Sequence, residues 1–308
     1  MTDRGEPLFI LAPPRSFTTV MCAIIGEHPQ MLGLPETNLF ARDSYVELRE
    51  LYSKRPSLQH GLLRSVAQLG LGGQSAQNIE VARRWLHGYS RASTADLFSD
   101  LLAWAAPQRL VDKSPSYVYS RDSLARIRRA FPNAYYLHLL RHPRGTCESK
   151  YALRQRSQER QAQSRRRHDP DAVGLDDERR PPIDADFTWL TPHRTIVDFL
   201  ATVPPERQLR LRGEDVLADL DTYLPRIAKW LGVDDDTAAL ERMKHPETSP
   251  FACFGPPNAR LGDDPGFLEK PWLRPYKHKA EDLEAPLSWD PKLTFSGAVK
   301  ELARSFGY

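Results

Sequence analysis

Short runs of apolar residues, each followed by a segment with helical periodicity, predict an α/β fold for this chain. Leu8–Leu11 is the first run, and Val20–Ile25 behind it has helical spacing. Further runs of strand length are Arg109–Val111, Tyr135–Leu140 and Gln208–Leu211. Strands that alternate with helices form parallel sheets covered on both faces. We therefore expect a P-loop-like parallel sheet flanked by helices.

One long helical segment interrupts this alternation. Residues 43–105 carry apolar positions at helical spacing, so we expect a helical insertion after the first strand–helix unit. Later helices are expected over Ser120–Phe131, Val216–Leu231 and about Lys292–Phe306. A length of 308 residues suits one large α/β domain or two modest ones, and we predict a single domain over residues 1–308.

The turn after the first strand, Pro13–Thr19, has the residues of an anion site. A helix N-terminus offers unpaired backbone N–H groups, and the helix dipole favours negative charge there. Arg15 adds a cation, and the hydroxyls of Thr18 and Thr19 add donors. The expected guest is a phosphate or a sulfate group. The alternative is an ordinary helix start with a hydroxyl cap and a surface arginine.

A second strand-to-helix junction has a similar character. Arg141 follows the strand at Tyr135–Leu140, and Ser149 lies eight residues later, inside the next predicted helix. A guanidinium and a hydroxyl so placed can hold one phosphate from two sides. Two such junctions suit a ligand with phosphates at both ends.

Two common nucleotide-binding classes are disfavoured by missing glycines. No glycine lies between Leu8 and Thr19, so the G-x-x-x-x-G-K-[ST] loop of nucleotide triphosphatases is absent. No G-x-G-x-x-G turn opens a helix either, which argues against a dinucleotide oxidoreductase.

Composition narrows the partners further. The net charge of +3 fits an anionic ligand but lacks the basic density of a nucleic-acid binder. Three cysteines without a C-x-x-C pair indicate a reduced, cytoplasmic protein without structural zinc, and the sequence offers no convincing metal cluster. No apolar run has membrane-spanning length, and the N-terminus lacks a basic signal region, so no membrane partner is expected.

These motifs resemble those of sulfotransferases that use 3′-phosphoadenosine 5′-phosphosulfate (PAPS). Pro14–Thr19 resembles their 5′-phosphosulfate loop, usually P-[KR]-S-G-[ST]-T, and the spacing from Arg141 to Ser149 resembles their 3′-phosphate site. The resemblance spans roughly residues 8–268. It continues through His28-Pro29, Pro35-Glu36-Thr37, Asp112-Lys113-Ser114-Pro115, Phe131-Pro132-Asn133-Ala134, Glu214-Asp215 and Gly262-Asp263-Asp264-Pro265. Sulfotransferase domains of polyketide synthases look closer still, and tyrosylprotein sulfotransferases share part of the pattern.

The resemblance implies PAPS as co-substrate, no metal, and a set of binding residues. Arg260 is implied as a further contact of the 3′-phosphate, with Lys270, Arg274 and Lys277 as alternatives. The residues expected to bind the co-substrate are Arg15, Ser16, Phe17, Thr18, Thr19, Arg141, Ser149 and Arg260. Phe17 stands where the family has glycine. Its N–H can still serve the ligand if its φ stays negative, and its ring must then point away from the ligand.

The resemblance also implies the catalytic residues. Glu36 lies twenty-one residues after Arg15, as does the general base of the tyrosylprotein enzymes, and a partly buried carboxylate suits that task. Arg15 and Lys113 are expected to stabilise the charge that develops during transfer. The alternatives are a helix-cap or turn carboxylate for Glu36 and, for Lys113, a salt bridge with Asp112 or another carboxylate. Three histidines (His138, His142 and His193) are fallback bases, and Glu214-Asp215 is expected to brace the structure.

Arg154–Pro182 has almost no apolar residues. One interpretation is a solvated helix end followed by a surface loop. The other is a functional segment, either a mobile lid over the acceptor pocket or a docking surface for an acidic partner.

Our hypothesis is a cytoplasmic sulfotransferase that acts on a hydroxyl compound. The acceptor is either a small free molecule or a secondary metabolite tethered to a carrier, and the oligomeric state is open. The alternatives are a small-molecule kinase with a degenerate phosphate loop and a catalytically inactive nucleotide-binding module.

Overall fold

In the computed structural model, which describes residues 5–89, 92–168, 183–276 and 281–308, the strands form one parallel sheet. The sheet has five strands in the order β2-β3-β1-β4-β5, and every neighbouring pair is parallel. The strands are β1 (Leu8–Leu11), β2 (Met31–Gly33), β3 (Arg109–Asp112), β4 (Tyr135–Leu140) and β5 (Gln208–Arg212). Because β3 and β4 lie on opposite sides of β1, the sheet has a crevice outside the carboxyl end of β1, where α/β proteins place ligands.

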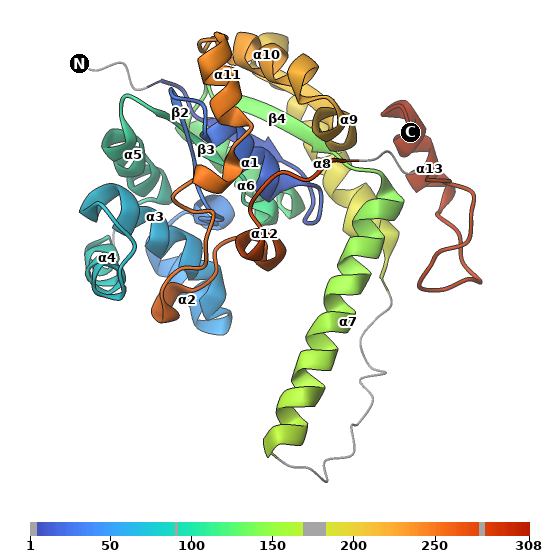
Figure 1. The fold of residues 1–308 in the computed structure, drawn as a ribbon, viewed down its shortest axis with the longest axis horizontal. Coiled ribbons are helices and arrows are strands. Elements are labelled where there is room, and N and C mark those ends of the chain that lie inside the picture. The colour runs from blue at the N-terminus through green and yellow to red at the C-terminus, as the bar shows by residue number, and fades with distance from the viewer. Residues whose placement is uncertain (1–4, 90–91, 169–182, 277–280) are drawn as a thin grey trace.

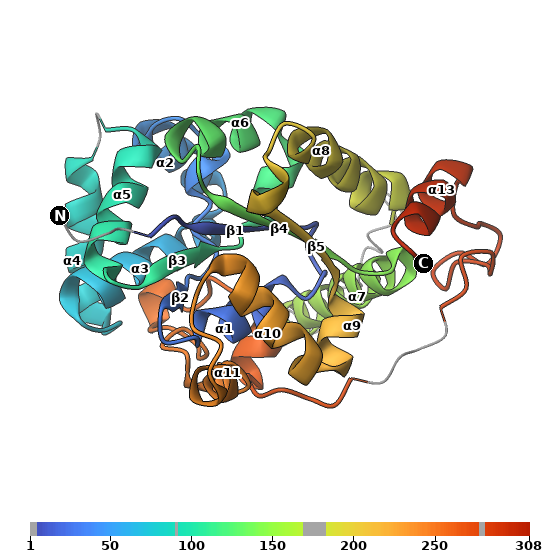
Figure 2. The ribbon, with the colours of Figure 1, turned by 90° about the horizontal axis from the view of Figure 1, so that it is seen from above.

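Helices cover both faces of the sheet, as the alternating strands and helices predicted (Figures 1 and 2). Leu8 and Ile10 in β1 pack with α1, α10 and α11, whereas Phe9 and Leu11 pack with the helices on the other face. Successive side chains of a strand point to opposite faces, which explains why all four are buried. The helices up to β4 are α1 (Thr18–Gly26), α2 (Tyr45–Lys54), α3 (His60–Leu71), α4 (Ala76–Gly88), α5 (Thr94–Ala105) and α6 (Arg121–Ala130). After β4 come α7 (Pro143–His168), α8 (Thr191–Leu200), α9 (Gly213–Ala218), α10 (Leu220–Leu231), α11 (Thr237–Met243), α12 (Pro265–Glu269) and α13 (Gly297–Ser305).

The predicted helical insertion is present as α2–α5, but it follows a strand that the sequence analysis missed. That strand, β2, has only three residues, Met31–Gly33, which is too short to show a periodicity. It pairs with β3 at the edge of the sheet.

The helix predicted over Val216–Leu231 is wrong in its boundaries, because two helices occupy this region. The break lies at Asp219, whose backbone has φ of −144° and whose side chain accepts a hydrogen bond from Thr222 N–H. This side chain caps α10 and lets the chain change direction between α9 and α10. The predicted C-terminal helix likewise begins later than expected, at Gly297 with Ser296 as its cap.

The arginine-rich helix α7 extends away from the body of the molecule (Figure 1). It covers the first part of the predicted lid, residues 154–168, whereas 169–182 lie outside the described residues. Within the ranges described, no helix combines the length and the apolar character needed to cross a bilayer.

Candidate active site

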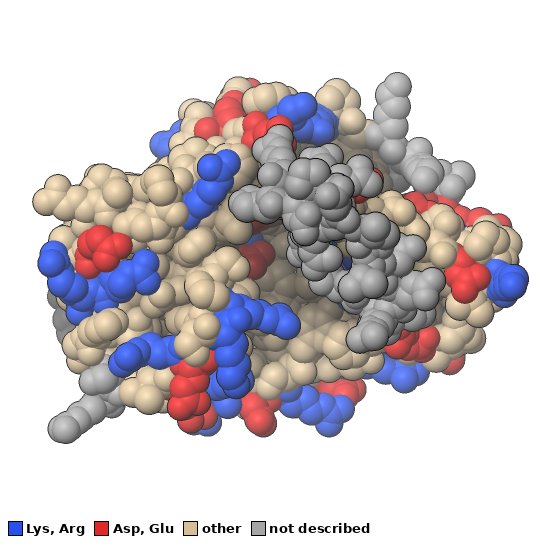
Figure 3. All heavy atoms as spheres, turned by 90° about the horizontal axis from the view of Figure 1, so that it is seen from below, with Lys and Arg blue, Asp and Glu red and all other residues tan. Residues whose placement is uncertain are grey.

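A cavity of about 440 Å³ lies at the carboxyl ends of the central strands. Its walls come from the start of α1 (Phe17–Val20), from Glu36 after β2, from Arg141 after β4 and from the loop Asp263–Pro265. Figure 3, drawn from the side toward which α7 projects, shows the surface hollowed near its centre. Segments far apart in the sequence meet here because the carboxyl ends of parallel strands share one edge of the sheet.

The turn between β1 and α1 presents donors that no described residue uses. Arg15 and Phe17 both have left-handed backbones, with φ of 69° and 60°. No described residue accepts a hydrogen bond from the N–H groups of Ser16 to Thr19, and the buried Ser16 Oγ has no partner either. Left-handed residues other than glycine cost about 1–3 kcal/mol each and cluster at functional sites. Together with the helix N-terminus, this turn has the geometry of an anion site.

Arg15 connects the turn to two other segments of the cavity. Its Nε donates a hydrogen bond of 3.0 Å to Ser149 Oγ on α7. Its Nη1 forms an ion pair of 2.7 Å with Asp264 Oδ2. The Arg15 side chain is only 20% exposed, so protein covers most of its surface.

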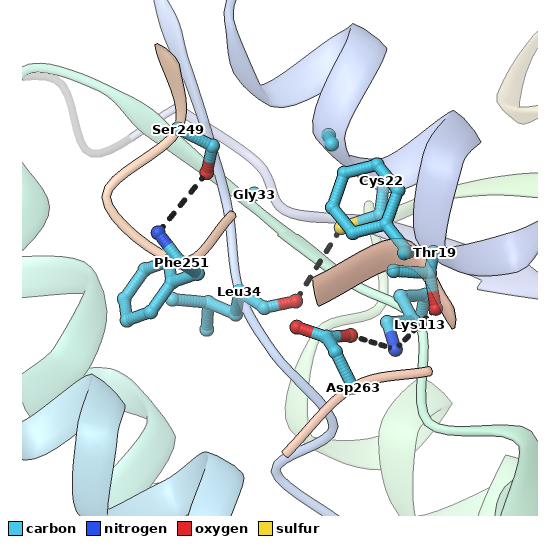
Figure 4. Close-up of a pocket in the computed structure, with 10 residues that line it drawn as sticks. Thr19, Cys22, Gly33, Leu34, Lys113, Ser249, Phe251 and Asp263 are labelled. Carbon is cyan, nitrogen blue, oxygen red and sulfur yellow. Dashed lines mark hydrogen bonds and ion pairs between the residues drawn. The ribbon is translucent and has the colours of Figure 1, made fainter. Parts of the chain in front are cut away.

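Lys113 lies buried beneath the cavity, where the side chains of Thr19, Asp263 and Glu36 surround its ammonium group. Figure 4 shows Thr19 and Asp263 beside it. Its Nζ is 3.2 Å from Thr19 Oγ1 and 3.1 Å from Glu36 Oε1, and it also pairs with Asp263. Burial alone lowers the pKa of a lysine, but Asp263 and Glu36 together raise the pKa of Lys113 above its usual value. The ammonium group is therefore held in its charged form.

Of the carboxylates that line the cavity, Asp263 next to Lys113 is the least solvated, with a side chain 6% exposed. Burial raises its pKa to about 6, although the lysine opposes this shift. Glu36 is more accessible, with a side chain 30% exposed, and its backbone N–H donates to Gly262 O at 2.8 Å. Both carboxylates on Lys113 line the cavity, and Glu36 is the more exposed of the two.

Asp112, the neighbour of Lys113 in sequence, has a structural role instead. It accepts hydrogen bonds from Thr37 Oγ1, Tyr117 OH and Ser114 Oγ and is fully buried. These donors satisfy the carboxylate in the core. Lys113 does form a salt bridge, but with Glu36 and Asp263 rather than with Asp112.

Arg141 reaches the same turn from the end of β4. Its Nη1 donates a hydrogen bond of 2.6 Å to Arg15 O, and its guanidinium lies 4.3 Å from the centroid of the Phe17 ring. The condition of a negative φ at Phe17 is not met, because its φ is 60°. The ring packs beneath Arg141 and against Gly213, and Ser149 contacts Arg15 rather than Arg141.

Three of the other predicted residues, Arg260, Lys270 and Arg274, are not among the residues that line the cavity. Arg260 is exposed, with its guanidinium over the ring of Phe254 at 4.5 Å, while Lys270 and Arg274 are exposed and Lys277 is outside the described residues.

The three histidines are buried, and none is among the residues that line the cavity. His138 and His193 form a hydrogen bond of 2.9 Å with each other. Glu214 accepts a hydrogen bond from the backbone N–H of His142 at 2.8 Å, in keeping with its expected bracing role. Within the described ranges, no group of three or more metal-binding side chains was found.

Sequence reasoning considered the segment around Asp263 and Asp264 as a loop that closes over the nucleotide, but it gave neither carboxylate a role of its own. The structure brings these consecutive residues to the two buried or half-buried cations of the site, Lys113 and Arg15. The two adjacent aspartates were the available signal. Buried acids need cationic partners, so acids within a motif expected near an anion site indicate pairing with the cations of that site.

Comparisons with known proteins give a consistent result. Residues 7–237 match the model of a family described as "Sulfotransferase family". Among solved structures, the sulfotransferase domain from the curacin biosynthetic pathway superposes with a TM-score of 0.74 at 23% identity, covering 99% of this chain and 98% of that one. The sulfotransferase domain from the Synechococcus PCC 7002 olefin synthase gives 0.73 at 26% identity, with coverage of 99% and 97%. No curated protein sequence matches the chain.

Proposed function

The chain belongs to the sulfotransferase family, and we propose that it transfers a sulfuryl group from PAPS to a hydroxyl acceptor. The observation that carries this proposal is the convergence of two arginines, Arg15 and Arg141, with a turn of free N–H groups in one cavity. Such a site suits a ligand with anionic groups at two ends. We further propose that residues 1–308 act as one domain and that the protein is cytoplasmic.

The turn Arg15–Thr19 fits the 5′ end of this co-substrate. The Ser16 hydroxyl is buried and has no partner among the residues that the structure describes, and a helix of nine residues starts directly behind it at Thr18. Phosphate and sulfate oxygens would supply the missing acceptors, and the helix dipole favours their charge. Arg15 adds a cation that is free to turn from Asp264 toward the ligand, because a partly exposed ion pair is weak.

Arg141 and Ser149 are proposed to bind the 3′-phosphate from the opposite side of the turn. Arg141 is held near its observed position by Arg15 O, while Ser149 Oγ already accepts from Arg15 Nε. A guanidinium can hold a phosphate through two parallel hydrogen bonds, which suits this role. Arg260 has no part in this proposal, because it lies outside the cavity wall.

Glu36 is proposed as the general base and Lys113 as the group that positions it. PAPS supplies the sulfuryl group, and 3′,5′-adenosine bisphosphate is the leaving group. As the acceptor oxygen forms its bond to sulfur and the bridging oxygen departs, Glu36 takes the acceptor's proton. Lys113 contacts Glu36 at 3.1 Å and Thr19 at 3.2 Å, so it links the proposed base to the turn Arg15–Thr19. With Arg15 it would offset negative charge in the transition state.

The acceptor is proposed to lie along the apolar part of the cavity wall. Val20, Pro115, Leu153 and Phe267 line this part, next to Glu36. A largely apolar wall with one carboxylate suits an alcohol or a phenol with an apolar body. The likeness to domains from the curacin pathway and an olefin synthase favours a secondary-metabolite acceptor, free or tethered to a carrier.

A transfer assay tests the proposal. The protein is incubated with sulfur-labelled PAPS and a panel of aliphatic alcohols, phenols and carrier-tethered hydroxyl compounds, with Glu36→Gln as the matched control. We expect label in at least one acceptor with the wild type and a large loss with the variant. Binding of the bisphosphate without transfer to any acceptor would favour the inactive binding module. Transfer of phosphate from ATP with magnesium would favour the kinase.

A further inference from the structure

The ring of Phe17 lies directly under the guanidinium that the proposed function assigns to the 3′-phosphate. We propose that Phe17 is a positioning residue, whose ring holds Arg141 in the orientation that recognises a 3′-phosphate. This inference rests on the proposed function, and it gives the ring of Phe17 a role beyond the backbone contact of the turn.

Two contacts fix the Arg141 side chain from the same turn. The guanidinium carbon is 4.3 Å from the Phe17 ring centroid, within the range of cation–π attraction. Arg141 Nη1 donates to Arg15 O at 2.6 Å. A planar guanidinium that stacks on a ring and donates from one edge keeps its other N–H groups in a defined direction. Phe17 and Arg141 both line the cavity, so the stacked pair borders the space that a ligand would occupy.

The backbone at Phe17 indicates that the ring is selected for its contacts. Its φ of 60° and ψ of 12° lie in the left-handed region, which glycine adopts without cost. A phenylalanine there is strained, and the strain persists only where surrounding contacts compensate for it. The stacked Arg141 and an edge-to-face contact with Tyr276, at 5.8 Å between centroids, are such contacts.

Gly213 supplies the space that the ring needs. A Cβ atom at Gly213, which begins α9 after β5, would lie 2.6 Å from Phe17 Cδ2 and 3.3 Å from Leu140 O. That separation is too close for carbon atoms, so a side chain at this position would displace the ring. The position of the ring thus depends on three segments of the chain. They contribute the left-handed backbone of Phe17, the guanidinium of Arg141 and the absence of a side chain at Gly213.

The predicted consequence is specific to the 3′-phosphate. Without the ring, Arg141 has more orientations available, so a ligand must restrict it on binding. We expect Phe17→Leu to weaken binding of 3′,5′-adenosine bisphosphate about tenfold, in line with the strength of partly desolvated cation–π contacts. Binding of 5′-AMP, which has no 3′-phosphate, should stay within about twofold of the wild type, because Arg141 does not contribute to it.

The test is calorimetric titration of both nucleotides into the wild type, Phe17→Leu, Phe17→Tyr and Gly213→Ala. Phe17→Tyr keeps a ring and should retain bisphosphate affinity, whereas Gly213→Ala should lose it selectively, as Phe17→Leu does. Phe306→Leu is the matched control, because it removes a ring from beneath Arg210, at 4.9 Å, outside the cavity. In an Arg141→Ala background, Phe17→Leu should have no further effect on the bisphosphate.

The outcomes separate this inference from the function on which it rests. Equal losses for both nucleotides would overturn the inference, because the ring would then contact the ligand or support the whole turn. Unchanged bisphosphate affinity in Phe17→Leu would also overturn it, while leaving the proposed function intact. A wild-type protein that binds neither nucleotide would overturn both the proposal that PAPS is the co-substrate and the inference about Phe17.

Discussion

At the scale of single residues, two cations of the site, Arg15 and Lys113, pair with neighbouring aspartates on one loop. Asp264 pairs with Arg15 at 2.7 Å, and its neighbour Asp263 pairs with the buried Lys113. The two pairs differ in accessibility: Asp264 is 30% exposed, whereas Asp263 is 6% exposed. An anionic ligand can therefore displace Asp264 from Arg15, while Asp263 stays paired with Lys113 in the cavity wall.

Replacing Asp264 should improve binding of the proposed co-substrate. Asp264→Asn removes the charge that competes for Arg15 but keeps the oxygen that accepts from Gly266 N–H at the start of α12. Because a partly exposed ion pair is worth about 0.2–1 kcal/mol, we expect up to about fivefold tighter binding of 3′,5′-adenosine bisphosphate. Titration calorimetry measures this, with Glu269→Gln on the same segment as control. Weaker binding in Asp264→Asn would mean that Asp264 itself contacts the ligand.

Removing the charge of Glu36 should separate chemistry from binding. Glu36→Gln keeps an oxygen that can accept from Lys113 but cannot take a proton from the acceptor. Loss of a general base typically costs about 10²–10⁴ in rate, so kcat should fall by that factor. Bisphosphate affinity should stay within about threefold of the wild type. The kcat and the dissociation constant are measured on the same preparation, and an undiminished kcat would exclude Glu36 as the base.

Some of these residues were predictable from the sequence, and the reason is the sheet. Arg15, Lys113 and Arg141 each follow an apolar run of strand length, and parallel strands bring their carboxyl ends together. The backbone of Phe17 was not predictable, because the contacts that stabilise it come from Arg141 and Gly213, far along the chain. The contact between Lys113 and Asp263 likewise depends on tertiary packing that no local pattern encodes.

At the scale of elements, β4 and α8 are joined by a buried pair of histidines. His138 in β4 and His193 in α8 are 2.9 Å apart, and Arg210 Nε in β5 donates to His138 Nδ1 at 3.1 Å. Burial lowers the pKa of His193 to about 3 and that of His138 well below its usual value. Both rings are therefore neutral in the folded protein at neutral pH.

This pair should make the protein less stable in mild acid. The unfolded chain takes up protons below about pH 6.5 while the buried rings do not, so the free energy of unfolding falls as the pH drops. At about pH 5.5 each ring costs about 1.4 kcal/mol relative to neutral pH. We expect His193→Gln to reduce the loss of stability between about pH 7.5 and 5.5 by that amount. Denaturant unfolding at both pH values measures it, with the exposed His87→Gln as control; equal losses in wild type and variant would contradict the account.

The helices show where local patterns were sufficient and where they were not. The apolar spacing of residues 43–105 predicted the insertion because α2–α5 pack one face into the core. The division between α9 and α10 was missed because Asp219 is compatible with a helix and acts as a cap only where tertiary contacts turn the chain.

At the scale of the whole molecule, a buried arginine connects the helical insertion to the loop that carries the aspartates. Arg64 in α3 is fully buried and donates to Leu261 O at 3.1 Å and Cys253 O at 2.9 Å. It also donates to Gln74 Oε1 at 2.6 Å. The insertion thereby supports the segment that ends at Asp263 and Asp264, although it does not itself supply the anion turn.

Removing this arginine should affect both stability and the cavity. Arg64→Leu removes the donor of these carbonyl oxygens, and each one that stays away from water without a donor costs about 1–3 kcal/mol. We expect the free energy of unfolding to fall by at least that amount and the loop to lose its fixed position. Arg84→Leu, exposed on α4, is the matched control. A variant as stable as the wild type would show that the loop is held by other contacts.

The central claim is that one cavity binds a nucleotide with anionic groups at both its 5′ and 3′ positions. The most direct measurement is the thermal shift of the wild type and of Arg141→Ala with 3′,5′-adenosine bisphosphate and with ATP plus magnesium. Ligand at about one hundred times its dissociation constant stabilises a protein by about 2.7 kcal/mol, which is readily visible. We expect a shift with the bisphosphate that is largely lost in Arg141→Ala. No shift with the bisphosphate, or a shift only with ATP and magnesium, would contradict the claim and favour a kinase.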